Sequence, residues 1–284
     1  MKEFEQALNR ARSMVSGDNE PVSHQAEPRP TPTIDGTPSL SAALAKGMDA
    51  PAAPRDYPVL EAQYEKFREN FGSTGPNARS VDGAFRILRT QVLAAMRDRG
   101  ARILGVTSPS PGAGKTVTSI HLAMACARRP EQHLTLADFD FRRPAVANYL
   151  DAAGFKSSVG FFRGEGNVGE YMTRTEAGNL NFLLTDRSSE MSAEFLAGDR
   201  MSQALDYMTR KPNSIVIADL PPMTGCDDTI AMLPKLDGIV VVVAAGEHSF
   251  SEVSRTIEQL PQEKIVATVL NKSETHSPYY EYYY

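Results

Sequence analysis

The chain has 284 residues and a formal net charge of −5, from 30 Lys and Arg against 35 Asp and Glu. This mildly acidic balance lacks the basic footprint of a nucleic-acid-binding protein, so no nucleic-acid partner is expected. The two cysteines, Cys126 and Cys226, lie far apart and form no CxxC pair, which argues against a zinc site or a disulfide framework. The longest apolar run, 239–245, is too short to cross a bilayer, and the N-terminus lacks a signal-peptide core. A cytoplasmic chain is therefore expected.

The two ends of the chain differ in composition from its middle. Residues 3–15 carry apolar side chains on one stripe, which predicts a short amphipathic helix that either caps the domain or docks a partner. Residues 17–56 are rich in Pro, Ala, Ser and Thr and have no periodicity, which is typical of a linker. We expect a helix at 1–16, a largely disordered Pro-rich linker at 17–79, a folded domain at 80–273 and a tyrosine-rich tail at 274–284.

Within the middle of the chain, short apolar runs alternate with helical spacing. Strands are predicted at 102–107, 133–138, 180–185, 214–219, 238–244 and 264–270. Helices are predicted at 80–98, 116–129, 144–152, 191–210, 227–235 and 250–260. This alternation predicts an α/β fold with a doubly wound, mostly parallel sheet covered on both faces.

A glycine-rich loop lies between the first predicted strand and the helix that follows it. Its residues Pro111, Gly112, Ala113, Gly114, Lys115, Thr116 and Val117 have the pattern of the end of a P-loop. Backbone N–H groups of such a loop surround phosphate oxygens, the lysine reaches the β- and γ-phosphates, and the threonine hydroxyl binds Mg²⁺. Pro109 replaces the first glycine of the strict pattern, and the alternative is a strand–helix turn that contains GKT by chance.

Two further predicted strands end in carboxylates. Asp138 ends the strand at 133–138 and Asp140 lies two residues beyond it, and Asp219 ends the strand at 214–219. Ligands of open α/β sheets bind at the carboxyl ends of the strands, where carboxylates can hold Mg²⁺ or accept a proton from a hydroxyl. Taken alone, the Asp138 segment is also compatible with a charged loop that caps the next helix.

In this order, the segments PGAGKT, LADFDFRRP and IVIADLPP, followed by terminal tyrosines, resemble the bacterial tyrosine kinases (BY-kinases) of capsule and exopolysaccharide synthesis. The resemblance covers roughly residues 80–284 and implies a P-loop NTPase fold of the MinD/ParA type, with ATP and Mg²⁺ and no other metal. It assigns catalysis to Lys115, Asp138 and Asp140, and metal binding to Thr116, Asp138 and Asp219. It also implies autophosphorylation of Tyr279, Tyr280, Tyr282, Tyr283 and Tyr284.

The resemblance also implies partners. The family's E-x-x-R-x-x-R helix builds a homo-oligomeric ring, and Arg86 and Arg89 match its arginines, whereas Gly83 stands at the glutamate position. Asn271 is a candidate for adenine contact by family analogy, or a strand-end turn residue. A membrane chain-length regulator (polysaccharide co-polymerase) is the implied second partner, which would place the chain peripherally at the inner face of the membrane.

The function expected from these residues is an ATP-dependent protein-tyrosine autokinase that modifies its own tail, between subunits, and thereby regulates polysaccharide polymerisation or export. One alternative is a positioning ATPase of the MinD/ParA type, whose signature lysine position is here Ser110. The other is a non-catalytic nucleotide-binding regulator of a membrane complex.

Overall fold

The computed structural model describes residues 57–72, 78–129, 131–224 and 227–273. The helix expected at 1–16 and the five terminal tyrosines lie outside the described residues. Among the helices that are described, none is long and apolar enough to span a membrane.

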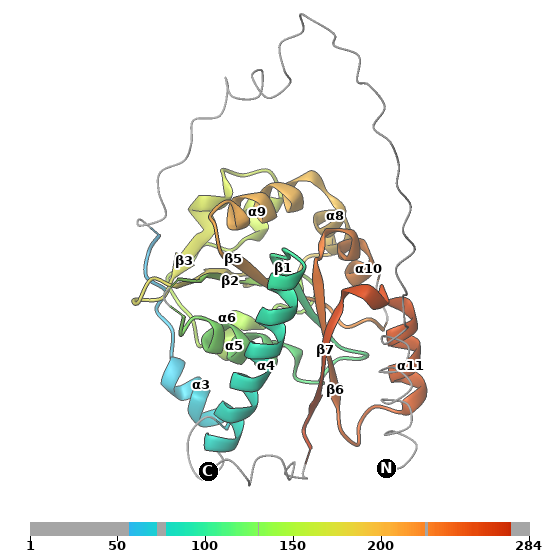
Figure 1. Cartoon of the computed structure of the whole chain (residues 1–284). Coiled ribbons are helices and arrows are strands. Elements are labelled where there is room, and N and C mark those ends of the chain that lie inside the picture. Colours follow the sequence, from blue (N-terminus) through green and yellow to red (C-terminus); the bar gives the residue numbers. More distant parts are fainter. Residues whose placement is uncertain (1–56, 73–77, 130, 225–226, 274–284) are drawn as a thin grey trace, which may run out of the picture. The chain divides into compact units, whose positions relative to one another are not determined.

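A seven-stranded sheet forms the centre of the described fold (Figure 1). Its strands lie in the order β3-β4-β2-β5-β1-β6-β7, and all neighbours are parallel except the antiparallel pair β3–β4. The six predicted strands are confirmed, and β3 is an addition that the sequence did not predict. The strands are β1 Ile103–Thr107, β2 His133–Asp138, β3 Met172–Arg174, β4 Leu180–Leu183, β5 Ser214–Asp219, β6 Gly238–Ala244 and β7 Ile265–Asn271.

Helices follow most strands, as the alternation predicted. They are α3 Tyr64–Asn70, α4 Ala78–Asp98, α5 Lys115–Cys126, α6 Val146–Tyr149, α7 Val159–Phe162, α8 Ser192–Ala197, α9 Asp199–Thr209, α10 Asp228–Met232 and α11 Phe250–Gln259, with three short 3₁₀ turns at Val168–Tyr171, Leu233–Lys235 and Gln262–Lys264. The single helix expected at 191–210 is divided at Gly198, whose ψ of 165° is extended, and the chain starts again as α9.

The strand sequences explain why both faces of the sheet are covered. In β6, Ile239, Val241 and Val243 belong to one buried cluster with α8, α9 and α10, whereas Val240 and Val242 belong to a second cluster with α4 and α5. Successive side chains of a strand point to opposite faces, so an unbroken apolar run requires helices on both sides. The doubly wound architecture is therefore confirmed.

The segment 57–72 differs from the expected linker. The backbone N–H of Leu60 donates to the Arg174 carbonyl, and that of Arg174 donates to Pro58, so the segment pairs with β3 at the edge of the sheet. It then forms α3, whose Phe67 is buried against the His121 ring of α5. We call residues 57–72 the edge strap, because the segment covers a strand edge that would otherwise present unpaired backbone groups. The folded unit thus extends N-terminally beyond the predicted boundary at residue 80.

His121 generates the first testable prediction. Its ring lies between those of Phe67 and Phe85, with centroid distances of 4.8 and 4.6 Å, and burial lowers its pKa to about 4. In the unfolded chain the pKa is about 6.5, so between these values the unfolded state binds a proton that the folded state does not. Stability should therefore fall as the pH drops from 7 to 4.5, by on the order of 3 kcal/mol at most.

Urea unfolding at several pH values measures this loss. His121→Gln, which cannot titrate, should reduce the pH dependence between 7 and 4.5. If stability depended on pH as steeply in this variant as in the unaltered chain, His121 would not be the group responsible.

Candidate nucleotide site

The strand order brings the predicted site residues to one edge of the sheet. β5 lies between β1 and β2, so Asp219 at its end is flanked by the loop that follows β1 and by the end of β2. Asp138 and Asp219 are direct partners in the β2–β5 register. Three segments far apart in the sequence therefore meet where ligands of open α/β sheets bind.

The glycine-rich loop has the backbone conformation that phosphate binding requires. Gly112 and Gly114 have φ angles of 85° and 88°, a region that side chains other than glycine rarely adopt. Gly114 is the N-cap residue of α5, a helix of 12 residues whose N-terminus carries the positive end of the helix dipole. Because backbone N–H groups and the dipole converge there, the loop is suited to an anion.

Asn271 lies against this loop. Its Nδ2 atom donates to the Ala113 carbonyl at 2.9 Å, and a Cβ atom on Gly114 would clash with the Asn271 amide. The structure thus brings Asn271 from the end of β7 to the phosphate loop, where it fixes the loop backbone. The observed contact of Asn271 is with the loop backbone, and its contact with adenine stays a prediction.

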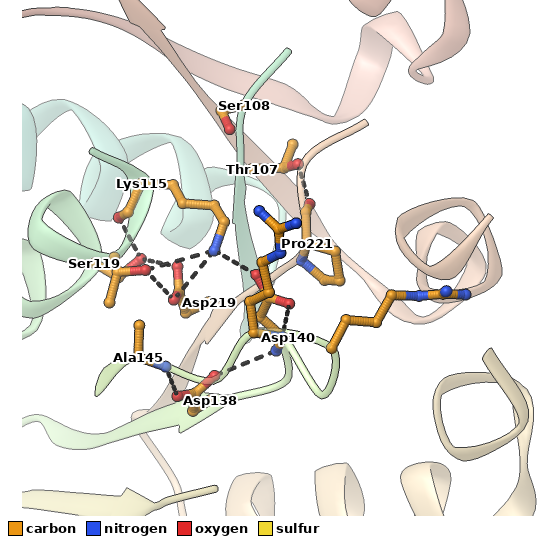
Figure 2. Close-up of polar contacts among 12 residues, drawn as sticks. Thr107, Ser108, Lys115, Ser119, Asp138, Asp140, Ala145, Asp219 and Pro221 are labelled. Carbon is orange, nitrogen blue, oxygen red and sulfur yellow. Dashed lines mark hydrogen bonds and ion pairs between the residues drawn. The ribbon is translucent and has the colours of Figure 1, made fainter. Parts of the chain in front are cut away.

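Lys115 is the centre of a buried ionic cluster (Figure 2). Its Nζ atom lies 2.8 Å from Asp140 Oδ2 and 3.6 Å from Asp219 Oδ2. Burial tends to lower the pKa of Lys115, but the attraction of Asp219 and Asp140 outweighs it and holds this pKa above its ordinary value. The ammonium group is therefore charged at physiological pH and positioned beside the phosphate loop.

Asp219 also binds two hydroxyl groups of α5. Thr116 Oγ1 donates to Asp219 Oδ2 at 2.6 Å, and Ser119 Oγ donates to Oδ1 at 3.1 Å. A threonine hydroxyl beside a carboxylate offers two hard oxygen donors of the kind that Mg²⁺ prefers. The pair fits a magnesium ion held jointly with phosphate oxygens, although the described residues contain no group of three or more His, Cys, Asp or Glu side chains placed to hold a metal.

Asp138 is oriented differently from the other two carboxylates. Its Oδ2 accepts hydrogen bonds from the backbone N–H groups of Ala145 and Val146, at 2.9 and 3.0 Å, and its Oδ1 accepts one from Asp140 N at 3.3 Å. Burial, together with repulsion from Asp219, raises the pKa of Asp138 well above its usual range. Asp138 thus holds the start of α6 and lies within the electrostatic reach of the cluster.

Two contacts at this edge were not predicted from the sequence. Arg142 donates from Nε to Asp228 Oδ2 at 2.6 Å and from Nη2 to Oδ1 at 3.1 Å, which ties the loop after β2 to the start of α10. His248 accepts a hydrogen bond from Ala244 N at its Nδ1, so its Nε2 carries the proton and donates to Ser110 Oγ at 2.8 Å. Arg142 belongs to the quoted DFDFRRP segment, whereas no sequence pattern marks Asp228 or His248.

The two predicted interface arginines lie on α4, apart from the ionic cluster. Arg89 donates from Nη1 to the Ala125 carbonyl at 3.3 Å, a contact within the chain that joins α4 to the last turn of α5. Arg86 lines a separate pocket between α3, α4 and α5. Their role in a subunit interface stays a prediction.

Comparison with known proteins agrees with this geometry. EpsB of Ralstonia solanacearum, named for tyrosine-protein kinase activity, is 30% identical over 186 residues, which are 65% of this chain and 24% of that protein. Tyrosine-protein kinase YwqD of Bacillus subtilis is 27% identical over 201 residues, which are 69% of this chain and 83% of that protein. The solved kinase domain of the Escherichia coli tyrosine kinase Etk matches with a TM-score of 0.65 at 25% identity, over 73% of this chain and 82% of that domain.

The chain is related to the bacterial tyrosine-protein kinases. No family model matches it. It spans about a quarter of the length of the first curated kinases that it resembles, so it corresponds to a part of those proteins. MinD of Pyrococcus horikoshii, solved with Mg-ADP, shares the fold at 17% identity and a TM-score of 0.50, over 63% of this chain and 75% of that protein.

The ionic cluster around Lys115 generates the second prediction. Lys115→Met leaves buried carboxylates without their cation, which should destabilise the fold by about 3–5 kcal/mol near pH 8. The folded state raises the pKa of Asp138 and of Asp219 above the unfolded value, so stability is highest below that value and falls as the pH rises through the folded pKa. The loss caused by the substitution should therefore be larger at pH 8 than at pH 5.5.

Thermal unfolding at these two pH values measures the difference. Lys156→Met, which removes a half-exposed lysine from a surface ion pair, is the matched control and should change little at either pH. Equal losses of stability for Lys115→Met at both pH values would refute the link between Lys115 and the ionisation of Asp138 and Asp219.

Proposed function

We propose that this chain is an ATP-dependent protein-tyrosine kinase that phosphorylates its own C-terminal tyrosine cluster. The observation that carries the proposal is the convergence of a P-loop lysine and threonine with carboxylates from the ends of β2 and β5. The relation to tyrosine kinases and the terminal residues Tyr279, Tyr280, Tyr282, Tyr283 and Tyr284 support tyrosine as the acceptor.

The residues of the loop would bind and orient the nucleotide. Backbone N–H groups of residues 112–117 face the phosphates, and Lys115 leaves Asp140 to neutralise charge on the β- and γ-phosphoryl oxygens. Thr116 and Asp219 would hold Mg²⁺, directly or through water. When bound, Mg-ATP would supply the γ-phosphoryl group, which is transferred in line to a tyrosine oxygen as the bond to the departing ADP breaks and the hydroxyl proton is lost.

An acidic residue at the end of β2 would accept the proton of the tyrosine hydroxyl. Asp138 and Asp140 lie beside the phosphate loop, and burial with repulsion from Asp219 raises the pKa of Asp138. A raised pKa makes this carboxylate a better proton acceptor than an ordinary aspartate. Asp140 holds Lys115 in place until phosphate takes over that contact. We therefore assign orientation and proton acceptance to Asp138 and positioning of the lysine to Asp140.

Regulation would follow from charge. Each phosphorylated tyrosine adds roughly −1.5 to −2 charges. Several of these on neighbouring residues repel one another and would disfavour the predicted ring of subunits. Through a membrane-bound chain-length regulator, this change would control polysaccharide polymerisation or export.

The third prediction concerns the activity itself. Purified chain incubated with Mg-ATP should acquire phosphotyrosine, detectable by antibody and by intact mass. Lys115→Met and a chain that ends at Ser277 should stay unmodified, while Lys156→Met should react like the unaltered chain. Hydrolysis of ATP without any phosphotyrosine, in the presence of the membrane partner's cytosolic segment, would instead support a positioning ATPase.

The fourth prediction distinguishes transfer between subunits from transfer within one chain. Lys115→Met keeps the tyrosines but lacks a working loop, whereas the chain that ends at Ser277 keeps the loop but lacks the tyrosines. Each alone should be inactive, and mixing them should place phosphate on the Lys115→Met chain. Transfer within one chain would be shown by two results together. The mixture would give no phosphotyrosine, and the autophosphorylation rate per molecule of the unaltered chain would not change on dilution.

A further inference from the structure

A pocket of about 130 Å³ lies between α3, α4 and α5, away from the phosphate loop. It reaches α5 at His121 and Ala125, whereas the loop joins α5 at Lys115. At 1.5 Å per residue, these positions are roughly 9–15 Å along the helix from Lys115. The pocket is thus separate from the nucleotide site and connected to it by one rigid helix.

Three guanidinium groups line this pocket, those of Arg68, Arg86 and Arg128. The carboxylates that face them are Asp82 and Glu65, so with a neutral His121 the lining has one net positive charge. Asp82 lies 3.8 Å from Arg68 and 3.9 Å from Arg128, beyond hydrogen-bond distance, and Arg68 reaches Glu65 at 3.5 Å. Such long, half-exposed ion pairs contribute little, so a stronger anion can displace them at low cost.

The wall of the pocket is aromatic. Phe85 and His121 stack with a centroid distance of 4.6 Å and an interplanar angle of 20°, and Met124 adjoins them. A cavity of about 150 Å³ is known to hold a benzene molecule, so the volume here is close to that of one phenyl ring. Methionine sulfur and aromatic faces both make favourable contacts with such a ring.

We propose that this pocket binds phosphotyrosine from the tail of a second copy of the chain. An aromatic wall suits the phenol ring, and arginines at the rim suit the dianionic phosphate, which guanidinium groups bind with paired, charge-assisted hydrogen bonds. The chain supplies such a ligand itself, because five of its last six residues are tyrosine. Arginine clusters are a recurrent means of recognising phosphorylated peptides. The proposal rests on the proposed kinase activity for the origin of the phosphate.

Fluorescence anisotropy with a labelled synthetic peptide of residues 274–284, phosphorylated chemically on Tyr280, tests the pocket without any enzymatic step. The protein is the full chain with saturating Mg-ADP, so that the phosphate loop is occupied, and Lys115→Met without nucleotide serves as a second background. The phosphopeptide should bind in both, and the unphosphorylated peptide should not. Phenyl phosphate should compete better than inorganic phosphate.

Arg68→Gln and Arg128→Gln should each weaken binding by about tenfold or more, the effect of losing one charge-assisted contact. Arg97→Gln is the matched control, since Arg97 lies on α4 with 80% of its side chain exposed and outside the pocket. Unchanged melting temperatures would establish that all three variants fold.

Equal binding of both peptides, equal competition by inorganic phosphate, or binding unaffected by the Arg68 and Arg128 substitutions would each overturn the proposal. Because the peptide is phosphorylated chemically, the binding measurement does not depend on kinase activity. The proposed pocket and the proposed kinase activity are therefore tested independently.

Discussion

At the carboxyl edge of the sheet, a single ammonium group, that of Lys115, faces three buried carboxylates. Asp138, Asp140 and Asp219 are almost entirely shielded from solvent, and a charge in such surroundings is costly unless it is paired. The chain meets part of this requirement with Lys115, part with the hydroxyls of Thr116 and Ser119, and part with the backbone N–H groups at the start of α6. Burial and the repulsion that remains raise the pKa of Asp138 and of Asp219, and a divalent cation would relieve that repulsion.

The strand order of the sheet brings these charged residues together. Because β5 lies between β1 and β2, the residue that ends β5 lies between the phosphate loop and the carboxylates after β2. Helices on both faces hold these strands in a fixed register, since alternate residues of β6 are buried in opposite clusters. The positions of the site residues are therefore set by the packing of the whole domain.

Much of this arrangement could be predicted from the sequence. Apolar β-branched runs predicted six strands, and PGAGKT with Asp138, Asp140 and Asp219 predicted a group of residues that the structure brings together, because both patterns are local and chemically specific. The edge strap could not be found in this way, since Leu60 pairs with Arg174 across more than a hundred residues. The strand β3 has only three residues, which is too short to show an alternating pattern. The orientation of Asp138 toward Ala145 and the contact of His248 with Ser110 depend on side-chain geometry that no spacing encodes.

The edge strap also defines how small the folded unit can be. A version of the chain that started at residue 80, where helical periodicity resumes, would lack Phe67 and the backbone partners of Arg174. Its β3 edge would then offer open hydrogen-bonding groups to any neighbouring strand, which is a common origin of aggregation. Recombinant fragments intended for crystallisation or NMR are better begun ahead of Tyr57, so that the sheet keeps its own cover.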